Sequence, residues 1–155
     1  LQFLQAWGCE GTAFSTSPAK EAEARGFGAD HFVSTRDADA LKALAGSLDM
    51  ILVTINVELD WEAYLAALRP RGRLHVVGAV PSVSAGGFSL IGGQKAISGS
   101  PLGSPATVGE MVAFAGRHEI APMTEHFRLS EVNEAMERLR SGQARYRIVL
   151  ENDLG

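Results

Sequence analysis

Residues 50–54 read Met-Ile-Leu-Val-Thr, an unbroken apolar run that ends in a hydroxyl side chain. A strand of this composition is typical of a parallel sheet with helices on both faces, because neither face then meets water. Other short apolar runs alternate along the chain with segments of helical periodicity. The sequence therefore predicts an α/β fold built on a doubly wound, Rossmann-type parallel sheet.

The boundaries of the predicted elements follow from turn residues and helix caps. Strands are predicted at 12–14, 31–33, 50–54, 74–77, 96–98 and 146–150. Helices are predicted at 1–7, 18–25, 38–45, 61–68, 88–91, 107–117 and 130–140. Ser17 and Pro18 suit the cap and first turn of the second helix, and 70–72 reads as a turn. The last helix is amphipathic, and its apolar face is formed by Leu129, Val132, Met136 and Leu139.

The composition excludes several classes of protein. The 155 residues carry 14 Lys and Arg against 18 Asp and Glu, a formal net charge of −4, which argues against a nucleic-acid partner. No apolar run is long enough to cross a bilayer. The single cysteine, Cys9, excludes an internal disulfide framework and a multi-cysteine zinc site within the chain. We therefore expect a cytoplasmic protein with no membrane partner.

The most informative segment follows the predicted strand 12–14. It reads Ser15-Thr16-Ser17-Pro18-Ala19-Lys20 and leads into a helix. In dinucleotide-binding folds the end of the second strand meets the adenosine ribose, and NAD-binding versions place a carboxylate there. Here three hydroxyls and a lysine suit an anion instead, such as the 2′-phosphate of NADP. In the alternative interpretation, Ser17 is only a helix cap and Lys20 is a solvated surface residue. The spacing of these residues alone favours this alternative.

Small residues at the ends of three further predicted strands form a second group of candidates. Ligands of open α/β sheets bind at the edge formed by the carboxyl ends of the strands. Each of these strand ends alone is more often a plain turn, but three of them together predict a cleft. The candidates are Thr54, Val57, Gly78, Ala79 and Ser100.

Other chemical signatures are missing from the sequence. No G-x-G-x-x-G loop lies between a strand and a helix, and the four histidines show no metal-ligand spacing. His31 and His75 fall in predicted strands and are interpreted as structural. Cys9 has no neighbouring base and is interpreted as an inert thiol. The residues themselves therefore point to binding and not to a catalytic centre.

The sequence resembles the zinc-dependent medium-chain alcohol dehydrogenases, in particular their cinnamyl-alcohol-dehydrogenase-like branch of NADP-dependent aldehyde reductases. The resemblance runs in order along nearly the whole chain and favours the anion interpretation of the segment after strand 12–14. It is carried by stretches that include Phe14-Ser15-Thr16-Ser17, Leu68-Arg69-Pro70, Ile97-Ser98-Gly99-Ser100, Ile120-Ala121-Pro122 and Arg145-Tyr146-Arg147-Ile148-Val149-Leu150.

The resemblance implies a function for the chain. The parent enzyme would transfer a hydride between NADP(H) and a primary alcohol or aldehyde, with zinc held by residues that this sequence lacks. Residues 1–121 would form a partial dinucleotide-binding domain, and 122–155 a segment that returns to the catalytic domain. No catalytic residue falls in the chain. The implied cofactor-binding residues are Ser15, Thr16, Ser17, Lys20, Thr54, Val57, Gly78, Ala79 and Ser100.

The resemblance also implies features of assembly. The family's glycine-rich turn and first strand would precede Leu1, so we expect the sequence to start inside a larger protein. Because the first strand is central in the doubly wound order, its absence predicts a gap between the second and fourth strands. The family further implies a homodimer through the edge strand between Leu90 and Ser100, where Lys95 is the single charge.

Two functional hypotheses stay open at this point. The first is the cofactor-binding portion of a zinc-dependent, NADP-dependent alcohol dehydrogenase, which is inactive without the rest of the enzyme. The second is a non-catalytic nucleotide-binding or assembly module. A zinc-free quinone-reductase relative is disfavoured by the Ser-Thr-Ser-Pro and Arg-Tyr-Arg matches.

Overall fold

The structure, a computed structural model, describes residues 1–154. The chain divides into two compact units, Leu1–Val108 and the residues from Gly109 onward. Among the described residues, no helix has the length and apolar character that a membrane crossing requires.

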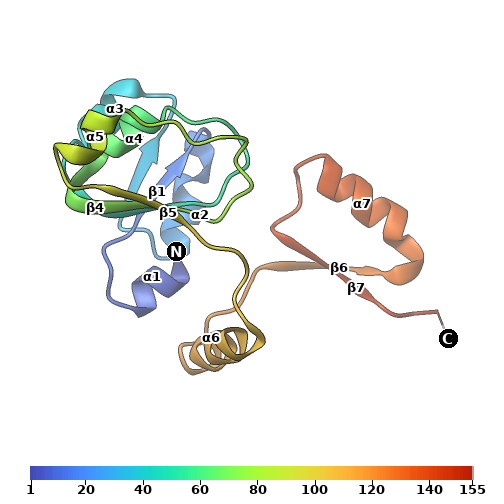
Figure 1. Ribbon diagram of the computed structural model, residues 1–155. Coiled ribbons are helices and arrows are strands. Elements are labelled where there is room, and N and C mark those ends of the chain that lie inside the picture. Colours follow the sequence, from blue (N-terminus) through green and yellow to red (C-terminus); the bar gives the residue numbers. More distant parts are fainter. Residues whose placement is uncertain (155) are drawn as a thin grey trace. The chain divides into compact units, whose positions relative to one another are not determined.

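Parallel strand pairs connected by helices make up the chain (Figure 1). The strands are β1 Thr12–Ser15, β2 His31–Ser34, β3 Leu48–Val53, β4 Leu68–Val76, β5 Ala96–Gly99, β6 Thr124–Arg128 and β7 Arg147–Glu151. The helices are α1 Gln2–Ala6, α2 Glu21–Gly26, α3 Ala38–Lys42, α4 Trp61–Ala67, α5 Gly87–Ile91, α6 Pro105–Arg117 and α7 Val132–Arg140. Two 3-10 turns, η1 Pro18–Lys20 and η2 Leu129–Glu131, lead into α2 and α7.

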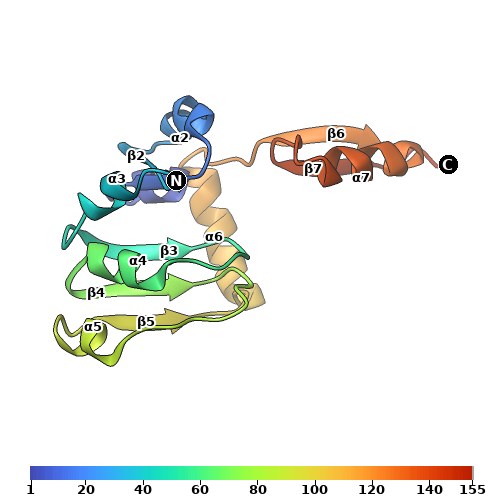
Figure 2. The ribbon, with the colours of Figure 1, turned by 90° about the horizontal axis from the view of Figure 1, so that it is seen from above.

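The strands of the first unit form two separate parallel sheets. One holds β1 and β2, and the other has the order β3-β4-β5, whose strands lie side by side in Figure 2. β1 and β3 are not hydrogen-bonded to each other in the described structure. A doubly wound sheet takes this form when the strand between them is absent. The Rossmann-type α/β fold and the expected gap are both confirmed.

The hydrophobic core of the first unit lies between the three-stranded sheet and α4. Asp60 caps α4 by accepting a hydrogen bond from the backbone N–H of Ala63 at 3.2 Å. Leu65 of α4 and Leu74 of β4 are both 0% exposed, and each such leucine stabilises the fold by about 1.5–3 kcal/mol. The core cluster consists of Ile51, Val53, Trp61, Tyr64, Leu65, Ala67, Leu68 and Leu74.

The apolar run of β3 predicts that helices cover both faces of this strand. This prediction is wrong for the described structure of this unit. Ile51 and Val53 are buried in the core cluster, whereas Met50 and Leu52 are each 53% exposed. Successive side chains of a strand point to opposite faces, and α4 packs on only one of them. The other face of β3 is therefore open in the described structure of this unit.

The turn predicted at 70–72 is also wrong, because β4 continues through these residues. The pairing between β3 and β4 shifts its register at this point. Arg71 adopts a positive φ of 65°, and its backbone N–H donates to the carbonyl of Gly93 at 2.7 Å. The Pro-Arg-Gly signal thus marks an irregularity within a strand that stays hydrogen-bonded to the rest of the unit.

The second unit contains a parallel pair, β6 and β7, packed with α7. β6 could not be predicted from the sequence, because its residues Thr-Glu-His-Phe-Arg form no apolar run. The predicted apolar face of α7 is partly wrong. Ala135 is the buried residue of this helix at 2% exposure, while Met136 and Leu139 are 41% and 50% exposed.

Candidate functional site

The carboxyl ends of β3, β4 and β5 meet at one edge of the sheet, because the three strands are parallel neighbours (Figure 2). The predicted residues on the loops that follow these strands are exposed or half-buried. Ligands of open α/β sheets bind at this edge. The structure thus brings one group of candidates together, namely Thr54, Val57, Gly78, Ala79 and Ser100.

Gly78 lets two of these loops approach each other. The backbone N–H groups of Val77 and Gly78 both donate to the carbonyl of Val53 at 3.0 Å. A Cβ atom at Gly78 would overlap the carbonyl oxygen of Ile55 and lie 2.8 Å from its carbonyl carbon. The fold itself therefore needs glycine here, whether or not a ligand also approaches the backbone.

Glu58 anchors the loops that follow β3 and β4. Its carboxylate accepts a hydrogen bond from the Ser82 hydroxyl at 3.2 Å and from the Trp61 indole N–H at 3.3 Å. Because Trp61 is only 4% exposed, this pairing connects the surface loops to the core. Glu58 could not be identified from the sequence, since nothing in the local pattern shows that Ser82 lies within its reach.

Ser100 is partly engaged by the fold. Its hydroxyl lies 2.9 Å from His75 Nε2, and the hydroxyl of Ser98 lies 2.9 Å from His75 Nδ1. His75 of β4 and Ser98 of β5 are direct partners in the strand register. These contacts agree with the interpretation of His75 as a structural residue, and they fix the position of the Ser100 hydroxyl.

The end of β1 forms a second group of candidates. The Ser15 hydroxyl accepts a hydrogen bond from the backbone N–H of Ser17 at 3.1 Å. Ser17 occupies the cap position of η1, yet its side chain makes no capping hydrogen bond. The predicted cap position of Ser17 is therefore confirmed, but its hydroxyl does not make the capping hydrogen bond. Within residues 1–154, no hydrogen bond or ion pair of the structure engages the side chains of Thr16, Ser17 or Lys20.

No interaction in the described structure joins these residues to the candidates on the larger sheet. The two strand systems touch through Phe14 of β1, whose ring meets that of Tyr64 edge-on at a centroid distance of 5.7 Å. Phe14 also packs against the core cluster. Burial, followed by the charge of Asp60, raises the pKa of the Tyr64 hydroxyl. This tyrosine is therefore neutral at physiological pH.

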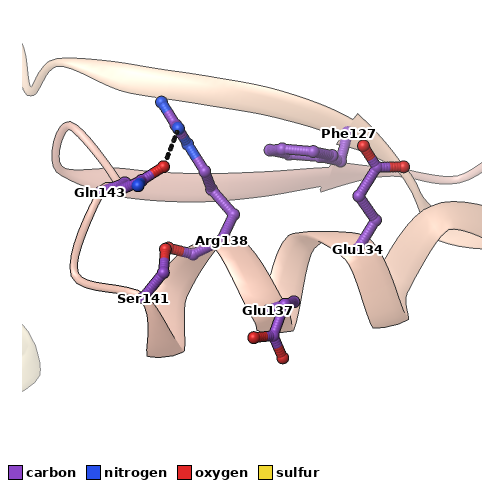
Figure 3. A pocket seen from close by; sticks show the side chains of 6 residues that line it. All are labelled: Phe127, Glu134, Glu137, Arg138, Ser141 and Gln143. Atoms are coloured by element: carbon purple, nitrogen blue, oxygen red, sulfur yellow. Dashed lines mark hydrogen bonds between the residues drawn. The ribbon is translucent and has the colours of Figure 1, made fainter.

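The second unit has a surface hollow of about 310 Å³, which Figure 3 shows. None of the residues that line it is among the predicted cofactor-binding residues. Its arginine, Arg138, pairs with Glu125 at 2.8 Å and donates to the side chain of Gln143 at 3.0 Å. The hydrogen bond from Arg138, and a second from the backbone N–H of Arg145, hold the pKa of Glu125 below its usual range. The residues that line the hollow are Phe127, Glu134, Glu137, Arg138, Ser141 and Gln143.

The hollow does not suit an anionic ligand. Glu134 and Glu137 contribute negative charge, and the guanidinium of Arg138 is already paired. A metal site is not formed here either, because the described residues contain no group of three or more His, Cys, Asp or Glu side chains placed to hold an ion. The end of β1 therefore remains the better candidate for a charged ligand.

Comparison with known proteins shows a consistent set of relatives. Residues 1–117 match the family described as zinc-binding dehydrogenase. The aldehyde reductase AdhA of Synechocystis sp. is 44% identical over 151 residues, which cover 97% of this chain and 45% of that protein. The chain thus spans less than half the length of this curated relative.

Solved structures give the same result. A cinnamyl alcohol dehydrogenase of Sorghum bicolor, SbCAD4, superimposes with a TM-score of 0.88 at 37% identity, over 96% of this chain and 43% of that one. The Helicobacter pylori cinnamyl alcohol dehydrogenase complexed with NADP(H) gives a TM-score of 0.78 at 27% identity, over 99% of this chain and 43% of that one.

Proposed function

The chain belongs to the zinc-binding dehydrogenase family, and we propose that it binds NADP(H) for an oxidoreductase acting on a primary alcohol and its aldehyde. The observation that carries this proposal is the end of β1, where hydroxyls and Lys20 stand in place of a carboxylate. The Helicobacter pylori relative, which was solved with NADP(H), supports the choice of cofactor.

The residues at the end of β1 fit a phosphate group. The hydroxyls of Thr16 and Ser17 and the ammonium group of Lys20 have no partner within residues 1–154, so they can donate to phosphate oxygens at little cost. Ser15 accepts from the Ser17 N–H and can still donate its own hydroxyl proton. We assign the 2′-phosphate of NADP to these four residues.

The remaining candidates would line the rest of the cofactor. Thr54, Val57 and Ala79 are exposed on the loops after β3 and β4, and Gly78 holds those loops together. Ser100 presents its hydroxyl at the end of β5, where His75 fixes it. An extended dinucleotide placed along this edge would meet both groups of residues.

The proposed reaction of the whole enzyme is a reversible hydride transfer. The alcohol carbon gives a hydride to NADP⁺ and the hydroxyl gives a proton to a base, which leaves the aldehyde and NADPH. The residues of this chain would bind and orient the cofactor. They do not fit a catalytic zinc site, because residues 1–154 offer no metal-binding group and a single cysteine, so zinc in the whole enzyme would be held by other residues.

We also propose a homodimer formed through β5, in a protein of the cytoplasm. β5 is an edge strand of its sheet, and beside it α5 exposes Phe88 at 91% and Ile91 at 73% (Figure 2). An apolar sheet edge of this kind is prone to pair with another chain. Replacement of Phe88 by Glu should shift the protein towards monomer in light scattering, and an unchanged mass would contradict this interface. Cell fractionation tests the compartment.

The test of the proposed function is the replacement Lys20→Ala in the full-length protein, with Lys42→Ala as the control. Loss of a charge-assisted hydrogen bond should weaken NADPH binding by about 10- to 100-fold and leave NADH binding nearly unchanged. Lys42 is exposed and pairs with Asp39, so its replacement should affect neither cofactor. Equal losses for NADPH and NADH in Lys20→Ala would contradict the proposal.

A further inference from the structure

The carboxyl ends of β1 and β2 are paired by backbone hydrogen bonds at one edge of their sheet. Ser15 and Ser34 are direct partners in the parallel register, and the backbone N–H of Thr35 donates to the carbonyl of Ser15 at 3.0 Å. Adjacent strands lie only about 4.8 Å apart. The residues that follow β2 are therefore neighbours of the hydroxyl segment that follows β1.

Arg36 occupies an exposed turn at the end of β2. The turn is closed by a hydrogen bond from the backbone N–H of Asp37 to the carbonyl of Ser34 at 3.1 Å. This geometry fixes the backbone of Arg36 one strand away from Ser15. An extended arginine side chain is longer than the spacing of two strands, so its guanidinium can reach the groups at the end of β1.

The carboxylates closest to Arg36 in sequence are already engaged. Asp37 Oδ1 accepts from the backbone N–H groups of Asp39 at 3.0 Å and Ala40 at 3.1 Å, as the cap of α3. The Asp39 carboxylate pairs with Lys42 at 3.3 Å. Across residues 1–154, no ion pair or hydrogen bond of the structure involves the side chain of Arg36.

Each of the two segments that end at this edge carries one cation. Residues 12–20 contain Lys20 and no carboxylate, and residues 31–36 contain Arg36 and no carboxylate, although the whole chain has a net charge of −4. The segments after β1 and β2 thus contribute two cations, Lys20 and Arg36, neither of which has a side-chain partner within residues 1–154.

We propose that Arg36 is a second specificity-determining residue for the phosphate monoester, acting from the turn after β2 together with Lys20. This inference rests on the proposed function and deepens it, since the phosphate is the 2′-phosphate of NADP. A guanidinium donates two parallel N–H bonds to phosphate oxygens, whereas the lysine ammonium acts as a point charge. Together they select a dianion over the neutral ribose hydroxyl of NAD.

The experiment measures binding of 2′,5′-ADP and of 5′-AMP to the chain by isothermal titration calorimetry. Arg36→Gln should weaken binding of 2′,5′-ADP about tenfold or more and leave 5′-AMP unchanged. Arg36→Lys keeps the charge but not the planar fork, and should give an intermediate loss. Arg117→Gln, an exposed arginine at the end of α6 with the same change in charge, should have no effect.

The outcomes separate this inference from the proposed function. If Lys20→Ala weakens 2′,5′-ADP and Arg36→Gln does not, the inference about Arg36 is wrong and the proposed function stands. If Arg36→Gln weakens both nucleotides equally, Arg36 does not read the phosphate and the inference is also wrong. If the wild-type chain fails to prefer 2′,5′-ADP over 5′-AMP, the proposed function fails, and the inference fails with it.

Discussion

The end of β1 and the ends of β4 and β5 carry similar small and polar residues, yet the fold uses them to different degrees. At the larger sheet, Gly78 is needed for the close approach to Ile55, and the hydroxyl of Ser100 is held by His75. At β1, the side chains of Ser17 and Lys20 have no partner within residues 1–154. A polar side chain that has no partner in the fold is the better indication of a ligand. A residue that the fold already needs, for packing or for a hydrogen bond, is accounted for without a ligand.

The largest expected effect comes from Gly78→Ala, which tests whether the loops of the larger sheet depend on this glycine. The added Cβ would overlap the backbone of Ile55, so we expect a loss of about 3 kcal/mol in the free energy of unfolding. Thermal unfolding followed by circular dichroism measures it. At Gly87, a Cβ meets nothing within 4 Å, so Gly87→Ala is the control and should leave the melting temperature nearly unchanged. A mild effect at Gly78, similar to that at Gly87, would show that the loops do not need their close approach.

A smaller effect is expected for Ser100→Ala, where the fold and the cofactor would share one hydroxyl. Loss of a neutral hydrogen bond costs about 1 kcal/mol, so NADPH binding should weaken roughly fivefold in the full-length protein. The loss for Lys20→Ala should be clearly larger, because a hydrogen bond from its ammonium group to phosphate would be charge-assisted. Fluorescence titration of NADPH compares the two variants. A larger loss of NADPH affinity for Ser100→Ala than for Lys20→Ala would contradict the conclusion that the end of β1 contributes more to cofactor binding than the edge of the larger sheet.

The smallest effect concerns Glu62 of α4, an exposed side chain that the fold nevertheless engages. Hydrogen bonds from the Ser89 hydroxyl and then from the backbone N–H of Gly86 hold its pKa below the ordinary value of 4.5. A lowered pKa means that the carboxylate stabilises the fold fully above pH 4.5, and that this stabilisation is lost as the pH falls through the lower folded-state pKa.

We therefore expect Glu62→Gln to lower the melting temperature slightly at neutral pH, and the difference from wild type to close in acid. Melting temperatures measured from neutral pH down to about pH 3 test this dependence. Glu110→Gln is the control, since Glu110 is exposed on α6 and no hydrogen bond or ion pair within residues 1–154 engages its carboxylate. A difference between Glu62→Gln and wild type that stays constant over this range would contradict the account.

Much of the first unit could be predicted from the sequence, because its longest strands contain apolar runs and two of its helices, α3 and α4, begin at aspartate caps. The run in β3 and the cap at Asp60 are examples. The partners of His75 could not be predicted, since they depend on the register of β4 against β5. The irregularity at Arg71 could not be predicted either, because Pro-Arg-Gly signals a turn whether or not the strand continues. β6 was missed because it contains a single large apolar residue, Phe127.

The candidate site could be predicted in part. Ser15 to Lys20 stand out because the residue types at the end of a strand differ from the expected carboxylate. Arg36 could not be assigned from the sequence, since only the pairing of Ser15 with Ser34 places it beside that segment.

The most direct test of the central claim is a titration of the isotopically labelled chain with 2′,5′-ADP, followed by amide ¹H–¹⁵N shifts in NMR spectra. We expect the largest shifts at Thr16, Ser17 and Lys20, with smaller shifts at the loops after β3 to β5. Shifts concentrated around Ser141 and Gln143, in the hollow of the second unit, would contradict it, as would a spectrum that does not change.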